Sequence, residues 1–271
     1  MNKPVTSEPA RLDVDAITVA YNGTPILKGV SFLVPQGARL AVVGPNGAGK
    51  STLFKALVGL LPLREGRIFI HGKSLGHHQD CVAYVPQRED VDWRFPVTVL
   101  DVVLMGRFGR LKFVQPPGRS DREAAMRALD QMGIAGLAGE SISALSGGQQ
   151  QRVFLARALA QEPHIFLMDE PFTGVDATTQ EATLALLDHL RREQVTVLIS
   201  THDLNLASSR FDLVLLLNRR LVAFGEPRQV FTTENLAQAF GPQLLRLADG
   251  TVFVDECCPP EDEHTHPGAA Q

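Results

Sequence analysis

The first third of the chain carries the hydrophobic patterns of β-strands. Leu12, Val14 and Ala16 alternate with polar residues, which is the period of a strand with one buried face. Residues 39–43 form a short apolar run before a glycine, which is typical of a buried central strand. Further strands are expected at residues 26–34, 67–71 and 81–85. Residues 50–60 have helical spacing, so we expect one helix within this series of strands.

The middle of the chain changes to helical periodicity. Apolar residues recur every three or four positions in residues 97–107 and 120–132, and a third helix is expected from about Gly148 to Gln161. Ser120 with Glu123 fits a capping box, which predicts that a helix begins at Ser120. These patterns predict an inserted helical subdomain at about residues 90–160.

Strands and helices then alternate. We expect strands at residues 164–168, 195–200 and 213–217 and a helix at residues 178–192. This order predicts an α/β fold with a mainly parallel sheet that is covered on both faces. Residues 257–271 are rich in Pro, Asp, Glu and His, so we expect a flexible tail there.

Composition excludes several classes of protein. With 271 residues, 44% hydrophobic and 21% charged, the chain suits a globular core and not wholesale disorder. A formal net charge of −4 argues against a basic nucleic-acid clamp. The three cysteines, Cys81, Cys257 and Cys258, offer no paired disulfide framework. Without a signal-peptide core or an apolar run near the roughly 20 residues that span a bilayer, we expect a soluble, cytoplasmic protein.

A phosphate-binding pattern lies between an expected strand and an expected helix. Residues 44–51 match G-x-x-x-x-G-K-[ST], in which glycines turn backbone N–H groups toward phosphate oxygens. Lys50 then reaches the outer phosphates, and the Ser51 hydroxyl binds Mg²⁺. The alternative, a glycine-rich turn without a ligand, requires a chance match with a probability on the order of 1%. The predicted ATP-binding residues are Gly44, Pro45, Asn46, Gly47, Ala48, Gly49, Lys50, Ser51 and Thr52.

Two carboxylates end the apolar run at residues 164–168. Asp169 is expected to hold Mg²⁺ directly or through water, and Glu170 to polarise the attacking water as general base. A solvated acidic turn is the alternative for an isolated Asp-Glu pair. The phosphate-binding pattern in the same chain favours an NTPase site.

A second phosphate cradle is expected at residues 145–149, Leu-Ser-Gly-Gly-Gln. A serine and two glycines open a predicted helix there, and a chance occurrence has a probability on the order of 10⁻³ or less. Two cradles on separate subdomains of one chain cannot close on one phosphate, whereas two chains arranged head to tail can. The predicted residues of this cradle are Ser146, Gly147, Gly148 and Gln149.

With these motifs in this order, residues 12–250 resemble the ATP-binding cassette (ABC) ATPases. The resemblance implies a P-loop NTPase core with N-terminal antiparallel strands, and a homodimer that sandwiches two ATP molecules. It implies that Tyr21 stacks on adenine, that Gln87 contacts Mg²⁺ and the attacking water, and that His202 contacts the γ-phosphate. Asp176 matches the loop after the catalytic glutamate, although Gly174 and Val175 replace the more common Ala-Leu. Singly, Tyr21, Gln87 and His202 also fit structural roles, and their joint order favours the site.

Residues 91–111 are similar to the cassettes of bacterial importers of divalent metals. The Val-Asp-Trp and Phe-Pro residues at 91–96 favour the manganese and iron branch over zinc. The resemblance implies integral-membrane permease partners, which Trp93 and Phe95 would contact, an extracytoplasmic metal receptor, and a place at the cytoplasmic face of the membrane. Packing within the subdomain is the alternative role of these aromatic residues. An ABC transporter ATPase for another substrate, a non-transport ATPase that remodels a soluble complex, and a module that binds ATP without turnover stay as alternatives.

The expected tail contains metal ligands. Cys257, Cys258, His264 and His266 have the chemistry of a metal sensor that slows the ATPase. A solvated tail without that function is the favoured interpretation, because acidic, Pro-rich ends are commonly disordered.

Overall fold

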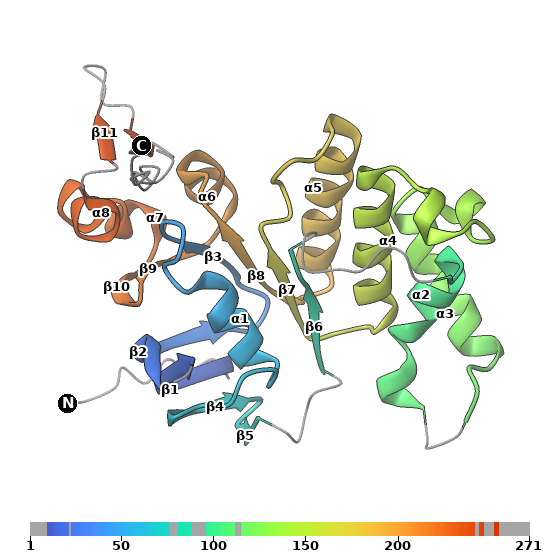
Figure 1. The fold of residues 1–271 in the computed structure, drawn as a ribbon, viewed down its shortest axis with the longest axis horizontal. Helices are drawn as coiled ribbons and strands as arrows, with labels where there is room; N and C mark the ends of the chain where they lie inside the picture. The colour runs from blue at the N-terminus through green and yellow to red at the C-terminus, as the bar shows by residue number, and fades with distance from the viewer. Residues whose placement is uncertain are drawn as a thin grey trace, which may run out of the picture.

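A computed structural model describes residues 10–21, 23–75, 81–87, 96–111, 115–241, 244–246 and 252–254. Two sheets and a group of helices build it, and the helical group extends to one side of the sheets (Figure 1). Trp93, Phe95 and the expected tail at residues 257–271 lie outside the described residues. Among the described helices, none combines the length and the apolar character needed to cross a membrane.

The larger sheet has six strands and confirms the predicted parallel core. Its strand order is β10-β9-β3-β8-β7-β6, and every neighbouring pair is parallel except β10 with β9. The strands are β3 (Arg39–Val43), β6 (Val82–Val85), β7 (Ile165–Asp169), β8 (Thr196–Thr201), β9 (Leu213–Asn218) and β10 (Arg220–Gly225). Every residue of β3, β7 and β8 is buried, as expected for central strands with both faces covered.

The smaller sheet is antiparallel, in the order β2-β1-β4-β5. Its strands are β1 (Ala10–Tyr21), β2 (Thr24–Pro35), β4 (Glu65–Ile70) and β5 (Lys73–Ser74). The predicted alternation fails at Ala16, which is exposed with a φ of 47°, while Ile17 is fully buried. The register of β1 against β2 shifts between Val14 and Ile17, so a bulge moves the buried face by one residue.

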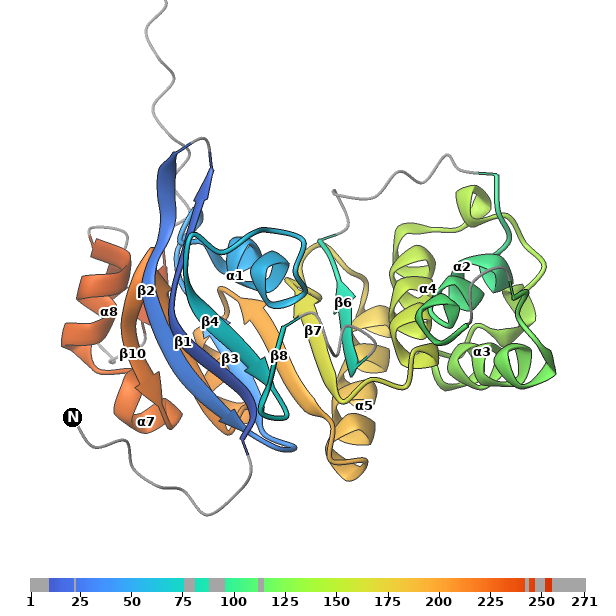
Figure 2. The same cartoon turned by 90° about the horizontal axis from the view of Figure 1, so that it is seen from below.

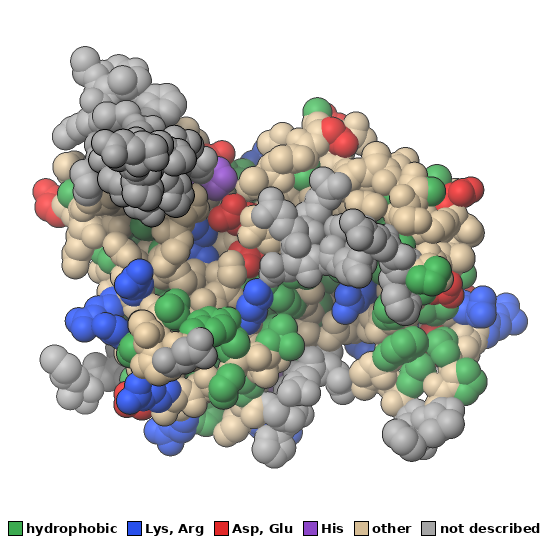
Figure 3. All heavy atoms as spheres, viewed as in Figure 1, with side chains coloured by type: hydrophobic (Ala, Val, Ile, Leu, Met, Phe, Trp, Pro, Cys, Tyr) green, Lys and Arg blue, Asp and Glu red, His purple; other side chains and the backbone are tan. Residues whose placement is uncertain are grey.

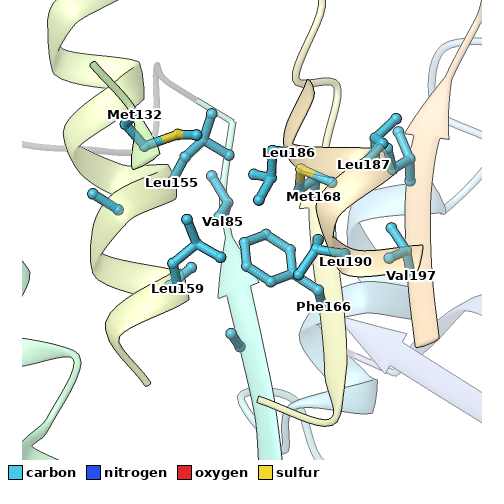
Figure 4. Close-up of a cluster of buried hydrophobic side chains, with 14 of the residues drawn as sticks. Val85, Met132, Leu155, Leu159, Phe166, Met168, Leu186, Leu187, Leu190 and Val197 are labelled. Atoms are coloured by element: carbon cyan, nitrogen blue, oxygen red, sulfur yellow. The ribbon is translucent and has the colours of Figure 1, made fainter. Parts of the chain in front are cut away.

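Neighbouring residues of β3 supply two separate cores. Leu40 and Val42 belong to the core between the two sheets, which also receives Phe54 from α1 (Lys50–Leu57). Ala41 and Val43 belong to the core on the opposite face, together with side chains of α5 (Ala177–Arg192). Figure 4 shows this second core, where Phe166 and Met168 of β7 meet Leu186 and Leu190 of α5. Figure 2 shows α1 and α5 on opposite sides of the strands.

The helical group contains α2 (Val99–Met105), α3 (Arg119–Gln131) and α4 (Gly147–Ala160), with short 3₁₀ turns at Phe108–Arg110, Ala135–Leu137 and Ile142–Ala144. The predicted start of α3 at Ser120 was wrong. Gly118 is the N-cap, and its N–H donates to the Asp121 carboxylate over 2.9 Å. Asp121 therefore performs the capping that sequence analysis assigned to Glu123, because a glycine cap offers no side chain for the pattern to detect.

The remaining elements follow β8 and were not predicted. They are α6 (Leu204–Arg210), α7 (Pro227–Val230), α8 (Thr233–Phe240), β11 (Leu244–Arg246) and β12 (Val252–Val254). Asp203 caps α6 and Thr232 caps α8, each accepting a hydrogen bond from the backbone N–H three residues on. The α6 cap matters for function because it fixes the chain directly after His202.

Candidate nucleotide-binding site

The loop between β3 and α1 has the backbone shape of a phosphate cradle. Gly47 and Gly49 have φ values of 74° and 98°, in the left-handed region that favours glycine. Gly44 approaches the carbonyl of Leu217 so closely that a Cβ atom would lie 2.1 Å from its oxygen. Lys50 is buried, and its ammonium donates to the carbonyl oxygens of Gly44 at 2.9 Å and Pro45 at 3.3 Å. The Lys50 side chain therefore crosses the loop, and its ammonium group lies against the loop's carbonyl oxygens.

The N-terminus of α1, the positive end of the helix dipole, follows this loop, and no acidic side chain in the first turn neutralises it. Gly49 is the N-cap and provides no side-chain hydrogen bond. The first helical bond runs from Leu53 N–H to the Gly49 carbonyl at 2.9 Å. The N–H groups of Lys50, Ser51 and Thr52 therefore precede the first bonded turn, where an anion is stabilised.

Asp169 is held at the end of β7 by two hydroxyl groups. Ser200 on β8 donates to Asp169 Oδ1 over 2.5 Å, and Tyr84 on β6 donates to Oδ2 over 3.4 Å. Asp169 is 2% exposed, so its carboxylate orientation is set by these neighbouring strands.

Glu170 leaves the strand with a strained backbone. Its φ is 47°, and its N–H donates to the same Ser200 hydroxyl over 2.8 Å. A non-glycine residue in this region costs about 1 kcal/mol or more, which a fixed environment must offset. The turn directs the Glu170 side chain away from the sheet and into the cleft beside the phosphate loop.

Basic groups surround the Glu170 carboxylate. His202 Nδ1 lies 3.6 Å from Oε2, Lys50 Nζ lies 3.4 Å from Oε1, and the Thr173 hydroxyl donates to Oε2 over 3.2 Å. His202 contributes most to lowering the pKa of Glu170 to about 2, and the charge of Lys50 adds to this against the opposing effect of burial. Glu170 is therefore ionised at neutral pH, which is the form that a general base needs, while its contacts with His202 and Lys50 lower its basicity.

A cleft of about 730 Å³ brings most of the predicted site together. Residues 46–52 of the phosphate loop line it, as do Tyr21, Gln87, Glu170 and His202. Gln87, Glu170 and His202 follow β6, β7 and β8, so parallel pairing places them at one edge of the sheet. Figure 3 shows a histidine and acidic side chains gathered near the middle of this face, close to α6. Tyr21 is 44% exposed, which suits a ring that stacks on a ligand.

The second predicted cradle does not line this cleft. Ser146 caps α4 by accepting from Gln149 N–H over 3.3 Å, and Gln149 Oε1 accepts from Ser146 N–H over 2.8 Å. Asp176 caps α5 and accepts from Thr179 N–H over 2.7 Å. A Cβ atom on Gly148 would lie 2.3 Å from Asp176 Oδ2, so these residues form one surface on the helical side. The structure thus divides the predicted nucleotide-binding residues into two groups.

Several residues of the site were not predicted from the sequence. Ser200 was only the end of an expected strand, and Thr173 was assigned no role. Arg219 lines the cleft from the turn between β9 and β10, where its φ is 57°. Its N–H donates to the Ala48 carbonyl over 2.8 Å, and its own carbonyl accepts from Lys28 N–H over 2.9 Å. The signal available in the sequence was a pair of arginines in a hairpin turn, which is not specific.

Comparisons with known proteins agree with this geometry. The sequence profile of the ABC transporter family matches residues 27–173. The manganese transport system ATP-binding protein MntB of Bacillus subtilis is 49% identical over 238 residues, which cover 88% of this chain and 95% of that protein. The zinc transport system ATP-binding protein TroB of Treponema pallidum is 47% identical over 233 residues, which cover 86% and 88%.

A solved structure of an ABC transporter has a similar fold. An inward-facing transporter assigned to the metal-chelate type of ABC transporter superposes with a TM-score of 0.75 and 32% identity, covering 89% of this chain and 94% of that chain. The phosphate loop, the strand-end carboxylates and the serine-capped α4 thus occur in the sheet and helix arrangement of that family. The chain belongs to the ABC transporter family and is one of its ATP-binding cassette ATPases.

Proposed function

We propose that this chain is the ATP-hydrolysing subunit of a transporter that imports a divalent metal ion, with manganese the first candidate and iron and zinc the others. The observation that carries the proposal is the complete cleft, in which Lys50, Gln87, Glu170 and His202 surround one space. An intact general base and an intact histidine argue against a module that binds ATP without turnover. The high identity to manganese and zinc transport proteins over most of both chains supports the choice of substrate class.

Mg²⁺ fits the oxygen donors that surround the phosphate loop. Ser51 and Gln87 line the cleft, and Asp169 ends β7 directly before Glu170, which also lines it. These residues offer a hydroxyl, an amide oxygen and a carboxylate, which are the donors that magnesium prefers. A carboxylate has about four acceptor positions, so the bonds from Ser200 and Tyr84 leave Asp169 able to meet a metal-bound water. When bound, Mg²⁺ would neutralise charge that develops on the phosphates.

Each side chain of the cleft then has its own role in ATP hydrolysis. Tyr21 stacks on adenine, Lys50 binds the outer phosphates, and the N–H groups that open α1 donate hydrogen bonds to phosphate oxygens. Glu170 accepts a proton from the attacking water, and Gln87 and His202 orient the water and the γ-phosphate. Binding of phosphate oxygens by Lys50 would separate its ammonium from Glu170, which frees the carboxylate for the water.

The second cradle serves a second copy of the chain. Ser146, Gly147, Gly148 and Gln149 open α4 away from their own cleft, so a head-to-tail partner would place them on the γ-phosphate bound by Lys50. Asp176 contributes to the same surface beside Gly148. Two composite sites in a homodimer follow from this arrangement.

The helical group provides the surface for integral-membrane permease subunits. Figure 3 shows hydrophobic side chains gathered over α2 and α3, and Phe108, just after α2, is 53% exposed. Trp93 and Phe95 lie between Gln87 and α2 in sequence, so this segment connects the cleft to the helical group. The chain would lie at the cytoplasmic face of the membrane, and an extracytoplasmic receptor would deliver the metal to the permease.

Metal accumulation in cells tests the proposal directly. Cells that lack the gene, complemented with the natural chain, should regain manganese, iron or zinc, whereas cells with Glu170→Gln should not. Trp93→Ala with Phe95→Ala should leave the ATPase of the free protein mostly intact. It should weaken co-purification with the permease, because buried aromatic anchors contribute about 2 kcal/mol or more each.

Two outcomes would reject parts of the proposal. Unchanged accumulation of all three metals with Glu170→Gln would exclude metal import. Co-purification with a soluble complex instead of a membrane permease would favour the alternative remodelling ATPase.

A further inference from the structure

Three metal-ligating side chains meet at the end of the central sheet opposite the nucleotide cleft. His71 lies in the turn between β4 and β5, Cys81 directly precedes β6, and His164 directly precedes β7. One ligand atom from each lies within 4.8 Å of the other two. The cleft residues Gln87 and Glu170 follow the carboxyl ends of the same two strands, so this cluster lies at the opposite end of those strands from the cleft.

The backbone around the cluster is fixed by the sheet. His164 N–H donates to the Cys81 carbonyl over 2.8 Å, and the His164 carbonyl accepts from Thr196 N–H over 3.0 Å. These bonds continue the parallel pairing of β6 with β7 and of β7 with β8. Cys81 and His164 are therefore neighbours by strand register.

His71 reaches the other two residues from the smaller sheet. Ile70 pairs with Lys73, so His71 and Gly72 form a two-residue hairpin turn with φ values of 50° and 74°. Such a turn prefers Asn, Asp or Gly at its first position, because left-handed backbone strains other side chains. This chain has an imidazole at that position, and its Nε2 lies 3.0 Å from Nδ1 of His164.

The two imidazoles already have nearly the spacing of metal ligands. Their rings meet edge to face at 81°, with centroids 5.0 Å apart. A tetrahedral zinc ion with bonds of about 2.0 Å to nitrogen places two such nitrogens about 3.3 Å apart. Of these two nitrogens one donates and the other accepts, so binding of both to one ion requires the donor ring to carry its proton on its other nitrogen, which neutral imidazole can do.

We propose that His71, Cys81 and His164 form a binding site for a zinc-class divalent cation. Two imidazoles and one thiolate are borderline to soft ligands, which favour Zn²⁺ and disfavour the oxygen-seeking Mg²⁺ and Mn²⁺. Water completes the tetrahedron, since His164 is exposed while His71 and Cys81 are half-buried. The bound ion joins the β4–β5 hairpin to the edge of the central sheet, so it stabilises the contact between the two sheets.

Cobalt binding to the full-length protein tests this site. Cys257→Ser with Cys258→Ser leaves Cys81 as the single cysteine of the chain. Adding Co²⁺ to this variant should give a thiolate-to-cobalt charge-transfer absorption and the intense visible bands of tetrahedral cobalt, and Zn²⁺ should displace both. A further Cys81→Ser change should abolish the charge-transfer absorption. His71→Ala and His164→Ala should each weaken binding at least about 10-fold, since loss of even an outer partner of a metal ligand costs that much.

Matched controls separate this cluster from other imidazoles. His189→Ala removes a histidine outside the cluster, and His264→Ala with His266→Ala removes two from the C-terminal segment. Both should leave the cobalt spectrum and affinity unchanged. Far-ultraviolet circular dichroism and binding of a fluorescent ATP analogue should show that each variant is folded.

X-ray absorption on the zinc-loaded Cys257→Ser, Cys258→Ser variant keeps the proposal testable if a ligand variant fails to fold. It should show one sulfur at about 2.3 Å and nitrogen or oxygen neighbours at about 2.0 Å. A zinc environment without sulfur would overturn the site. So would cobalt affinity that is unchanged in both His71→Ala and His164→Ala, or that is lost only when His77 and His78 are replaced.

Discussion

The Lys50 ammonium lies 3.4 Å from the Glu170 carboxylate, so the proposed phosphate-binding cation and the proposed general base contact each other across the cleft. Neither group is well solvated, with side chains 6% and 14% exposed. Each therefore stabilises the charge of the other until phosphate oxygens compete for Lys50. This relationship gives the clearest test of the catalytic assignment.

Replacing Glu170 by Gln should remove turnover and keep ATP binding. An amide has nearly the shape of the carboxylate but cannot take a proton, so hydrolysis should fall by on the order of 10²–10⁴-fold. Steady-state phosphate release measures the loss, and size exclusion should show an ATP-bound dimer that persists. Glu181→Gln, on the exposed side of α5, is the matched control and should hydrolyse ATP normally. Near-normal hydrolysis by Glu170→Gln would reject the general-base role.

The lowered pKa of Glu170 should appear in the acid stability of the protein. The pKa falls from the ordinary 4.5 to about 2 in the folded state, so the unfolded state binds the proton more tightly. The associated stabilisation is present above pH 4.5 and is lost as the pH falls toward 2. It amounts to about 3 kcal/mol, on the order of 1.4 kcal/mol for each unit of pKa. Urea unfolding of the natural chain and Glu170→Gln, at pH 6 and pH 3, should show a smaller pH dependence in the variant.

Ser200→Ala should disturb the Asp169 carboxylate and the backbone of Glu170 together. The hydroxyl donates to Asp169 and accepts from the strained Glu170 N–H, so its loss leaves two groups without this partner. We expect a loss of about 1–3 kcal/mol in the free energy of unfolding and a lower kcat. Ser208→Ala removes an exposed hydroxyl of α6 that bonds to the Asn205 carbonyl and takes no part in these bonds, so it should change neither quantity. A stable variant with unchanged kcat would show that Asp169 and Glu170 keep their geometry without Ser200.

Ser146→Arg should abolish hydrolysis without preventing ATP binding to its own phosphate loop. The α4 cap lies outside the cleft that Lys50 lines, so the variant blocks only a partner's site. A mixture of Ser146→Arg with Lys50→Ala should regain activity, because each mixed dimer contains one intact composite site. Specific activity should rise with protein concentration. Full activity of dilute monomers, independent of concentration, would contradict the shared site.

The periodicity of apolar residues predicted the strands that are buried along their whole length. It failed in β1, where a bulge moves the buried face by one residue. The strands β3, β7 and β8 are buried throughout, and such runs are visible in the sequence. The bulge at Ala16 cannot be recognised from the sequence, because no residue type at this position marks the shift in register that the paired strands show. Helix α6 buries only Ala207 and has no apolar stripe for periodicity to detect, whereas α2, of the same length, buries four apolar residues.

Some residues of the candidate site could be predicted from the sequence, and others could not. Glycines and charged residues of the phosphate loop have a fixed spacing, so the sequence alone identifies them. Ser200 enters the site from a strand that follows Asp169 by thirty-one positions, and only the pairing of β7 with β8 brings them together. Partners across a sheet depend on register, which a single sequence does not specify.

Arg219 should contribute to nucleotide affinity although no motif includes it. The turn between β9 and β10 is bonded to Ala48 in the phosphate loop and to Lys28 in β2, so its position in the cleft is fixed. A guanidinium there should attract phosphate or ribose oxygens, and one charged hydrogen bond contributes about 1.5 kcal/mol or more. Arg219→Ala should therefore raise the dissociation constant for ATP about 10-fold, as measured by titration with a fluorescent analogue. Arg220→Ala changes the neighbouring exposed arginine, which does not line the cleft, and should leave the affinity unchanged. Equal affinities of the two variants would show that the conformation of the turn, and not the Arg219 side chain, explains its place in the site.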